Sequence, residues 1–457
     1  MQIGVLYWRK AANIAGLLGI IVTLVLLPID RLPYLHHIPF GLGLIALVLL
    51  LVATADRLLN TALQKDFRRF KKYILIGVLL ALPVAGYAIS YFYAIDKHYT
   101  FGAAKALLAV ALRAYCFFVL VSERPALWPV IKKTIYITTA AVVAFGFFQY
   151  LFDVFGASPK ITDLGSCCTS NSTYIFPRVS STALEPLYLD SYLMIPIWLL
   201  TFDFLTSKKT RRNKYLLGLF IASSSLFILT IARSAILALA FAMVIFYFGL
   251  RGREKLRDFW VYMAKVWGIT LVVVIGLVAM SGVASIFIPK HPINGSNAGV
   301  TGSVELFGSH AVAITDASSQ SRYRLWSKSI GFIEKHPLKG VGAYNSRIEL
   351  NLDKYKNGAD PSTLQPFNND LIGLLVDLGL LGIVTFGPLL CLLIYIIYRS
   401  FKRHWPGHIA PMALILVAML IQSNFFHSIL LARLWVVVGL LLVDMSFGSQ
   451  KRQPQKT

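Results

Sequence analysis

The stretch Ile38-Pro-Phe-Gly-Leu-Gly-Leu-Ile-Ala-Leu-Val-Leu-Leu-Leu-Val-Ala-Thr-Ala55 contains 18 residues and no charged side chain. A helix of about 20 apolar residues spans a hydrocarbon layer of roughly 30 Å. Lipid offers no partner for a free backbone N–H or C=O group, so such a stretch crosses a bilayer as a helix. This stretch therefore predicts a protein that spans a membrane.

Similar apolar runs recur along the rest of the chain. Of the 457 residues in the whole chain, 57% are hydrophobic and 14% are charged, whereas soluble proteins carry about 25% charged residues. This composition excludes a cytosolic enzyme, a disordered chain and a fibrous repeat. Apolar runs predict spans at 12–29, 38–55, 73–94, 101–121, 134–152, 186–205, 215–231, 234–250, 264–287, 378–398, 409–424 and 428–446. We predict an all-α polytopic integral membrane protein with about twelve transmembrane helices and one long, partly helical periplasmic loop.

The positively charged residues are concentrated in connections between the predicted spans. The chain has 44 Lys and Arg against 21 Asp and Glu, a net charge of +23. Short basic clusters, such as Arg57 to Lys72 and Ser207 to Arg212, lie in every second connection. The positive-inside rule places these connections and both termini in the cytoplasm. The charge thus reflects topology, which predicts membrane lipids as partners and no nucleic acid.

The long connection after the ninth span lies on the opposite, outer side. The predicted organisation is 1–287 for spans one to nine, 288–366 for the outer loop, 367–446 for spans ten to twelve and 447–457 for a basic cytoplasmic tail. Loops of more than about 15 residues are usually functional or disordered. We expect this loop to be functional, because part of it has a helical pattern.

That pattern lies in residues 321–335. One apolar face is formed by Tyr323, Trp326, Ile330 and Ile333. Ser321 is the expected cap, and His336-Pro337 is the expected end, because the residue before a proline avoids the α region. Lys339-Gly340-Val341-Gly342 then predicts a turn whose backbone can approach a ligand closely.

These residues resemble a known family, the bacterial O-antigen ligases and O-antigen/exopolysaccharide polymerases. The string His336-Pro337-Leu338-Lys339-Gly340-Val341-Gly342 is similar to the family's signature. Matching residues upstream and downstream are Arg322, Trp326, Asn369-Asp370, Asp377 to Gly382, Ile231-Ala232-Arg233-Ser234 and Arg178 to Pro186. The resemblance covers about residues 175–400.

The chain also departs from the family pattern. Asn368 stands where members often have His, and Ala232 replaces the usual Ser. Glu185-Pro186 resembles polymerases more than ligases. These departures leave the choice between ligase and polymerase open.

The resemblance implies a glycosyltransferase in the bacterial inner membrane with a periplasmic active site. Its donor is a glycan on a polyprenyl (undecaprenyl) pyrophosphate. A ligase transfers the glycan to lipid A–core in lipopolysaccharide biosynthesis, whereas a polymerase transfers it to another lipid-linked repeat of O-antigen or exopolysaccharide. The resemblance implies no metal and no cofactor.

Roles for individual residues follow from this chemistry. We expect His336 to be the general base, because imidazole is suited to proton transfer near neutral pH. Arg178, Arg233 and Arg322 are the expected pyrophosphate ligands, because the guanidinium fork matches phosphate oxygens. Supporting positions are Glu185, Gly340, Gly342 and Asn369.

Other interpretations of the same residues stay open. His336 can simply interact with the end of a helix, and Arg233 can snorkel to the headgroups. Arg322 precedes His336 by 14 residues, which is roughly 21 Å along a continuous helix, so one site needs a broken helix or a long substrate. Another class of protein, a flippase or transporter of lipid-linked glycan, fits the composition, although no repeated halves are visible. No role is assigned to Lys105, Arg113, Asp190 or the Cys167-Cys168 pair.

Overall fold

The fold is known from a computed structural model, which describes residues 2–29, 38–155, 179–183, 185–211, 213–250, 256–287, 317–359, 364, 369–402, 409–425, 428–443 and 445. These residues form helices and connections, and no strand lies among them. The helices are α1 (Gln2–Leu26), α2 (Ile38–Leu63), α3 (Phe67–Ser90), α4 (Lys97–Glu123), α5 (Leu127–Val154), α7 (Pro186–Thr206), α8 (Lys208–Arg211), α9 (Lys214–Leu229), α10 (Arg233–Leu250), α11 (Leu256–Phe287), α13 (Ala317–Lys335), α14 (Ser346–Leu350), α15 (Leu352–Lys356), α16 (Asp370–Leu378), α17 (Leu380–Lys402), α18 (Ile409–Gln422) and α19 (Ala432–Leu442).

The prediction of an all-α polytopic membrane protein is confirmed. In the part of the chain that the structure describes, 9 helices are long and apolar enough to cross a bilayer by length and composition. The shorter apolar helices α9, α18 and α19 fall on the predicted spans 215–231, 409–424 and 428–446. Each predicted span thus corresponds to an apolar helix.

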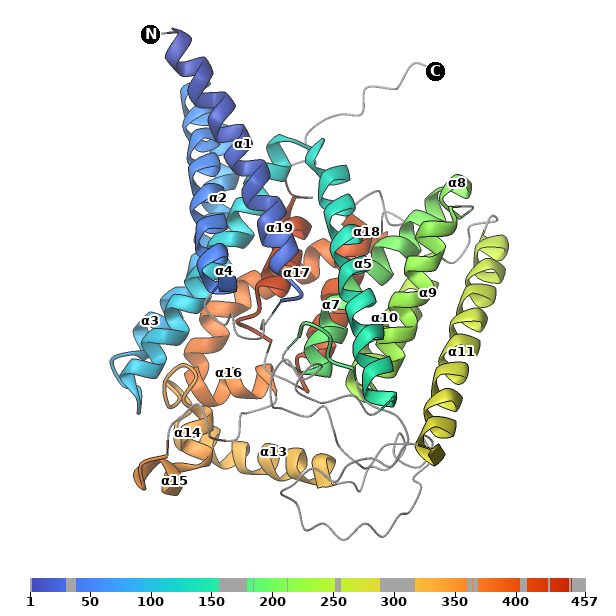
Figure 1. Ribbon diagram of the computed structural model, residues 1–457. Helices are drawn as coiled ribbons and strands as arrows, with labels where there is room; N and C mark the ends of the chain where they lie inside the picture. The colour runs from blue at the N-terminus through green and yellow to red at the C-terminus, as the bar shows by residue number, and fades with distance from the viewer. Residues whose placement is uncertain are drawn as a thin grey trace. The chain divides into compact units, whose positions relative to one another are not determined.

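The chain forms two compact units. Unit 1 contains Met1–Thr23, Leu44–Val130 and Ala317–Thr457, and unit 2 contains Leu24–Gly43 and Ile131–Asp316. Unit 1 therefore joins the first helices of the chain to the last, and it also holds α13 and the short helices α14 to α16 (Figure 1). Unit 2 holds most of α5 and the helices α7 to α11.

Helix α4 lies at the centre of unit 1. It packs against α3 and α19, and α17 packs against α3. A Cβ atom on Gly439 would lie 2.3 Å from the carbonyl oxygen of Ala114, so α19 and α4 are in backbone contact. Small residues allow membrane helices to approach in this way, because packing rather than hydrophobicity drives their association.

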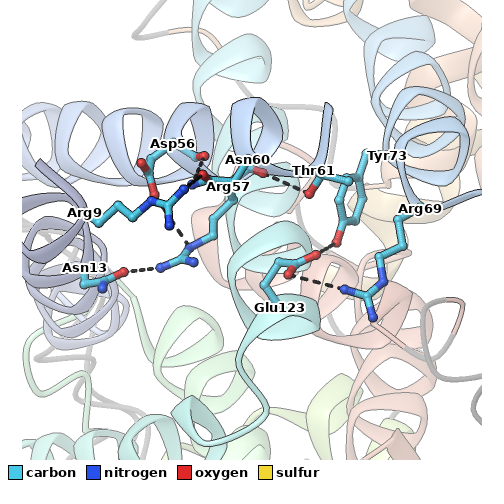
Figure 2. Close-up of polar contacts among 9 residues, drawn as sticks. All are labelled: Arg9, Asn13, Asp56, Arg57, Asn60, Thr61, Arg69, Tyr73 and Glu123. Carbon is cyan, nitrogen blue, oxygen red and sulfur yellow. Dashed lines mark hydrogen bonds and ion pairs between the residues drawn. The ribbon is translucent and has the colours of Figure 1, made fainter. Parts of the chain in front are cut away.

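A polar cluster joins the opposite end of the first four helices, away from α13 to α16. Figure 2 shows it among Arg9, Asn13, Asp56, Arg57, Asn60, Thr61, Arg69, Tyr73 and Glu123. Arg9 donates to Asn60 Oδ1 at 2.6 Å, and the Arg57 guanidinium donates to Asn13. Glu123 accepts from the Tyr73 hydroxyl and pairs with Arg69 at 3.7 Å. These contacts tie α1 to α2 and α3 to α4 at the end that the charge pattern predicts to be cytoplasmic.

Unit 2 is organised around α7. This helix packs against α9 and α10, and α11 packs against α9. Proline at the first position suits the start of a helix, because its missing N–H has no intrahelical partner there, and α7 begins at Pro186. Nearly all of its side chains are buried, and Trp198 contacts Phe246 of α10 edge to face. Helix α7 is therefore the core of unit 2.

Two local expectations are corrected. Helix α13 begins at Ala317, so Ser321 lies inside it and is not its cap. Ile330, expected on the packed apolar face, is 61% exposed, whereas Ser329 is buried. The tenth span, predicted over 378–398, corresponds to α17 (Leu380–Lys402), and a break at Gly379 separates its start from α16. The expected end of α13 at His336-Pro337 is confirmed.

Candidate functional site

The break between α16 and α17 holds the turn that contains His336. In a continuous helix, the N–H groups of Leu380 and Leu381 would bind the carbonyls four residues earlier. Here the Leu380 N–H donates to Pro337 O at 2.8 Å, and the Leu381 N–H donates to Leu338 O at 3.2 Å. Residues 336–342, which we call the motif turn, thus replace part of the helix's own hydrogen bonding.

The carbonyls freed by the break are bound by the same motif turn. Val376 O accepts from the Val341 N–H at 3.0 Å, and Asp377 O accepts from the Gly342 N–H at 2.9 Å. Buried backbone groups need such partners, because an unpaired N–H or C=O group away from water costs free energy comparable to a lost hydrogen bond. Two intrahelical bonds are therefore exchanged for four bonds between the break and the motif turn.

Glycine is required where these backbones meet. Gly340 has φ +66°, and a Cβ atom there would lie 2.4 Å from the carbonyl carbon and oxygen of Asp377. Gly379 has φ +58°, and its Cβ would lie 2.6 Å from Pro337 O. Side chains other than hydrogen are disfavoured at such angles. The close approach expected of the motif turn is thus made to the protein's own backbone.

Asp377 fixes the residues that follow the motif turn. Its carboxylate is buried and accepts from the Tyr344 N–H at 2.8 Å and the Ser346 N–H at 2.7 Å, one with each oxygen. Hydrogen bonds to a charged acceptor are stronger than neutral ones. Burial raises the pKa of the Tyr344 hydroxyl to about 12, which keeps it protonated. Asp377 therefore acts as a clamp on residues 344–346.

The turn between α3 and α4 supports the motif turn from its other side. Asn345 is fully buried, donates to Thr100 Oγ1 at 2.6 Å and accepts from the Asp96 N–H at 2.8 Å. The Ser90 hydroxyl accepts from the Ala343 N–H at 3.0 Å. A Cβ on Gly342 would meet Ala94 at 2.5 Å. The motif turn is therefore held between α16–α17 and the end of α3.

His336 differs from its neighbours because it is exposed. Its backbone is fixed, since its N–H donates to Phe332 O at 3.0 Å and its carbonyl accepts from the Gly340 N–H at 3.0 Å. Lys339 in the same turn is also exposed. Exposed side chains on a rigid backbone can meet a substrate without a rearrangement of the chain.

The Asn369-Asp370 pair begins α16. Asn369 is its N-cap and accepts from the Ile372 N–H at 2.9 Å. The Asp370 carboxylate accepts from the Ser428 backbone at 2.9 Å and from its hydroxyl at 2.6 Å. Side-chain oxygens at this position satisfy N–H groups that the helix leaves open. Asn369 therefore caps α16, and Asp370 fixes it against the segment that precedes α19.

In unit 2, Arg233 is the first residue of α10 and is partly exposed. The turn before it is strained, because Ile231 has φ +56°, an angle that β-branched residues rarely adopt. Thr230 holds this turn by donating to Asp190 Oδ2 of α7 at 2.7 Å, and both residues are fully buried. Strain of this kind persists only where surrounding contacts enforce it.

The residues before α7 are also inserted into unit 2. Gln149 of α5 accepts from the N–H groups of Ser180 and Ser181 at 3.2 and 2.8 Å, and all three side chains are buried. Glu185 is the N-cap residue of α7, is partly exposed and makes no capping hydrogen bond. This segment therefore brings an acidic residue to the start of α7.

The predicted site residues fall into three groups. Unit 1 contains His336, Gly340 and Gly342 at the break between α16 and α17, and Asn369 at the other end of α16; unit 2 contains Glu185 and Arg233. Arg178, the side chain of Arg322, Asn368 and the Cys167-Cys168 pair lie outside the described residues. The convergence of His336 with the three arginines stays a prediction.

The sequence reasoning missed two groups of residues. Asp377 was recognised only as part of a family block, although an acidic residue inside an apolar run is costly and signals a specific partner. Tyr99, Tyr344 and Arg347 carried no signal in the sequence, because they meet only through the fold. Lys105, whose environment was open, is exposed and lies 4.7 Å from the Phe101 ring centroid.

Comparison with known proteins locates a family match over this site. Residues 218–387 match the family model described as O-antigen ligase. The match contains Arg233, the motif turn and the break at Gly379. No curated protein matches the chain. Within the described residues, no three His, Cys, Asp or Glu side chains are grouped so that they could hold a metal ion.

Proposed function

Because the chain belongs to the O-antigen ligase/polymerase family, we propose that it transfers a glycan from a polyprenyl pyrophosphate to a sugar hydroxyl. The family and the apolar helices make it a membrane protein, and the reaction would take place at the periplasmic face. The acceptor is either lipid A–core or a second lipid-linked repeat.

The reaction exchanges one bond at the anomeric carbon of the donor. The acceptor oxygen forms a bond to this carbon while the bond from the carbon to the pyrophosphate oxygen breaks. The bonding electrons leave with the pyrophosphate, and the acceptor proton passes to His336. Proton transfer to a positioned base contributes about 10²–10⁴-fold to such reactions. The exposure of His336 on the fixed motif turn is the observation that supports this role most strongly.

The leaving pyrophosphate gains negative charge, which fixed cations stabilise. Arg233 suits this role because it stands at the start of α10, where the helix dipole and open N–H groups also favour an anion. The contact between Asp190 and Thr230 holds the turn before it. Arg178 and Arg322 are proposed as further ligands on the grounds of the family resemblance.

A deletion strain tests this proposal. The strain is complemented with wild type, His336→Ala or Lys339→Ala, and its surface and lipid-linked glycans are compared on gels. Lys339 is the matched control because it is exposed in the same turn. We expect His336→Ala to abolish transfer at a normal protein level and Lys339→Ala to preserve it.

The pattern of accumulated glycan separates the possible activities. Single repeats on the lipid carrier indicate a polymerase, and a full-length polymer on the carrier indicates a ligase. If no lipid-linked glycan reaches the outer leaflet, the protein is a flippase and the proposal is wrong. Full transfer by His336→Ala would exclude the base role of this residue.

A further inference from the structure

A triangular cluster of flat side chains follows the motif turn. The guanidinium carbon of Arg347 lies 5.6 Å from the Tyr99 ring centroid and 5.0 Å from that of Tyr344. The two ring centroids are 5.5 Å apart. All three side chains are partly exposed. These three distances are nearly equal, so the three side chains form a patch comparable in size to one sugar ring.

We propose that Tyr99, Tyr344 and Arg347 form a subsite that binds a sugar ring of the transferred glycan beside His336. This inference rests on the proposed function, because it assigns the subsite to the glycan of that reaction. The ligand class is a neutral or acidic pyranose.

The backbones of two of the three residues are held by hydrogen bonds to Asp377 and Asp96, which also support the motif turn. Tyr344 has φ +66°, which is unusual for a residue with a side chain, and its N–H donates to Asp377. Tyr99 is in the first turn of α4, where its N–H donates to the capping carboxylate of Asp96 at 2.9 Å. Strained backbone is found where surrounding contacts enforce a functional geometry.

The orientation of Tyr99 separates this patch from the lipid. Lys97, Phe101 and Lys105 follow one another at intervals of four residues and are all exposed, so they form one face of α4. Lys97 lies over the ring of Tyr91, as in the aromatic belts of membrane interfaces. Tyr99 is two residues from Lys97 and therefore points away from this face.

The chemistry of the patch suits a sugar. A pyranose has an apolar face of C–H groups, which packs on aromatic rings, and an edge of oxygen atoms. Stacking engages the face of a guanidinium, whereas its N–H donors lie in the plane of the group and meet acceptors at its edge. A surface of two tyrosines and one arginine thus matches both parts of the ring.

The patch lies within reach of the reacting end. The motif turn binds α17 through Leu380, and Tyr344 binds Asp377, three residues earlier. Pro337 O lies 2.8 Å from Leu380 N, the Tyr344 N–H lies 2.8 Å from Asp377, and the three residues between these contacts span at most about 11 Å. The backbone next to His336 and the patch are thus held to one short stretch of chain, and the patch is the subsite for a sugar that follows the reacting one.

The test measures sugar binding separately from transfer. The probe is the strain's own oligosaccharide, released from its lipid carrier by mild acid. It is titrated into the full-length protein in nanodiscs, in wild type and in the Tyr99→Ala, Arg347→Gln and Tyr91→Ala variants. Tyr91→Ala is the matched control, because this tyrosine is exposed on the lipid side of the same turn. Thermal unfolding of each variant checks its fold.

We expect the dissociation constant to rise about tenfold in Tyr99→Ala and Arg347→Gln, which is about 1.4 kcal/mol, and to stay unchanged in Tyr91→Ala. In transfer assays, the donor concentration at half-maximal rate should rise in the same proportion while the maximal rate is kept. Equal binding by all variants, or binding of free pyrophosphate but not of the oligosaccharide, overturns the subsite. If wild type binds the oligosaccharide in this pattern but transfers nothing, the proposed function fails and the subsite stands.

Discussion

Replacing Gly340 by alanine tests whether the motif turn depends on backbone contact with the break. The angle φ +66° costs about 1–2 kcal/mol for alanine. The new Cβ would lie 2.4 Å from Asp377 O and 2.5 Å from Leu378 N, where ordinary contact begins at 3.4 Å. The two backbones must therefore separate by about 1 Å, which is the difference between these distances.

This separation lengthens two hydrogen bonds, from Val341 N to Val376 O and from Gly342 N to Asp377 O. Each contributes about 1 kcal/mol. Together with the backbone strain, the local free energy of opening should fall by roughly 3–4 kcal/mol. Such a change raises the open population of the turn by on the order of 100-fold or more.

Hydrogen exchange of the purified protein measures this opening directly. Amides of residues 340–346 should exchange on the order of 100 times faster in Gly340→Ala, and glycan transfer should be lost. The control is Gly331→Ala in α13, where a Cβ meets nothing within 4 Å. Alanine should stabilise that helix by up to about 1 kcal/mol. Wild-type exchange and transfer in Gly340→Ala would refute the reasoning.

Two further substitutions test the residues that hold each part of the site. Asp377→Asn removes the charge and leaves the N–H group of either Tyr344 or Ser346 without an acceptor. We expect local stability to fall by about 2–3 kcal/mol. Hydrogen exchange measures this as faster exchange of these two amides. Unchanged protection there contradicts the clamp. Arg233→Lys keeps the charge but loses the guanidinium fork, so the transfer rate should fall at least about tenfold at a normal protein level. Unaltered turnover excludes pyrophosphate binding by Arg233.

The spans were predictable because hydropathy alone determines them. The run Ile38 to Ala55 lies inside α2 (Ile38–Leu63), and the polar residues that extend α2 are satisfied by contacts such as that of Asn60 with Arg9. Hydropathy does not encode those pairings, so the predicted span ended too early. Helix ends in this protein thus depend on side-chain partners rather than on apolar length.

The break at Gly379, at the start of the tenth span, was not predictable by the same means. Leu378, Gly379 and Leu380 are all apolar, and a glycine inside such a run is compatible with a continuous membrane helix. The decisive feature is the positive φ of Gly379, which is adopted because the motif turn, some 40 residues earlier in the chain, supplies alternative hydrogen bonds. A pairing over that distance leaves no periodicity in the sequence.

The candidate site was predictable only in part for a related reason. The signature from His336 to Gly342 identified the correct segment, but it did not separate residues that shape the backbone from residues that meet a substrate. In the structure, Gly340 and Gly342 are buried against neighbouring backbone, whereas His336 is exposed. The glycines of the signature therefore have a packing role that accounts for their position without a ligand.

The exchange of hydrogen bonds at Gly379 makes the break and the motif turn depend on each other. A broken helix leaves N–H and C=O groups without intrahelical partners, and a buried group that stays unpaired costs about 1–3 kcal/mol. The motif turn supplies partners for Leu380 N and Val376 O, and in return the break supplies partners for Pro337 O and Val341 N. Each conformation therefore supplies hydrogen-bond partners to the other, so the segment that carries His336 is fixed to the start of α17. This coupling is a physical reason for a signature that joins a short turn to a glycine-containing span far along the chain.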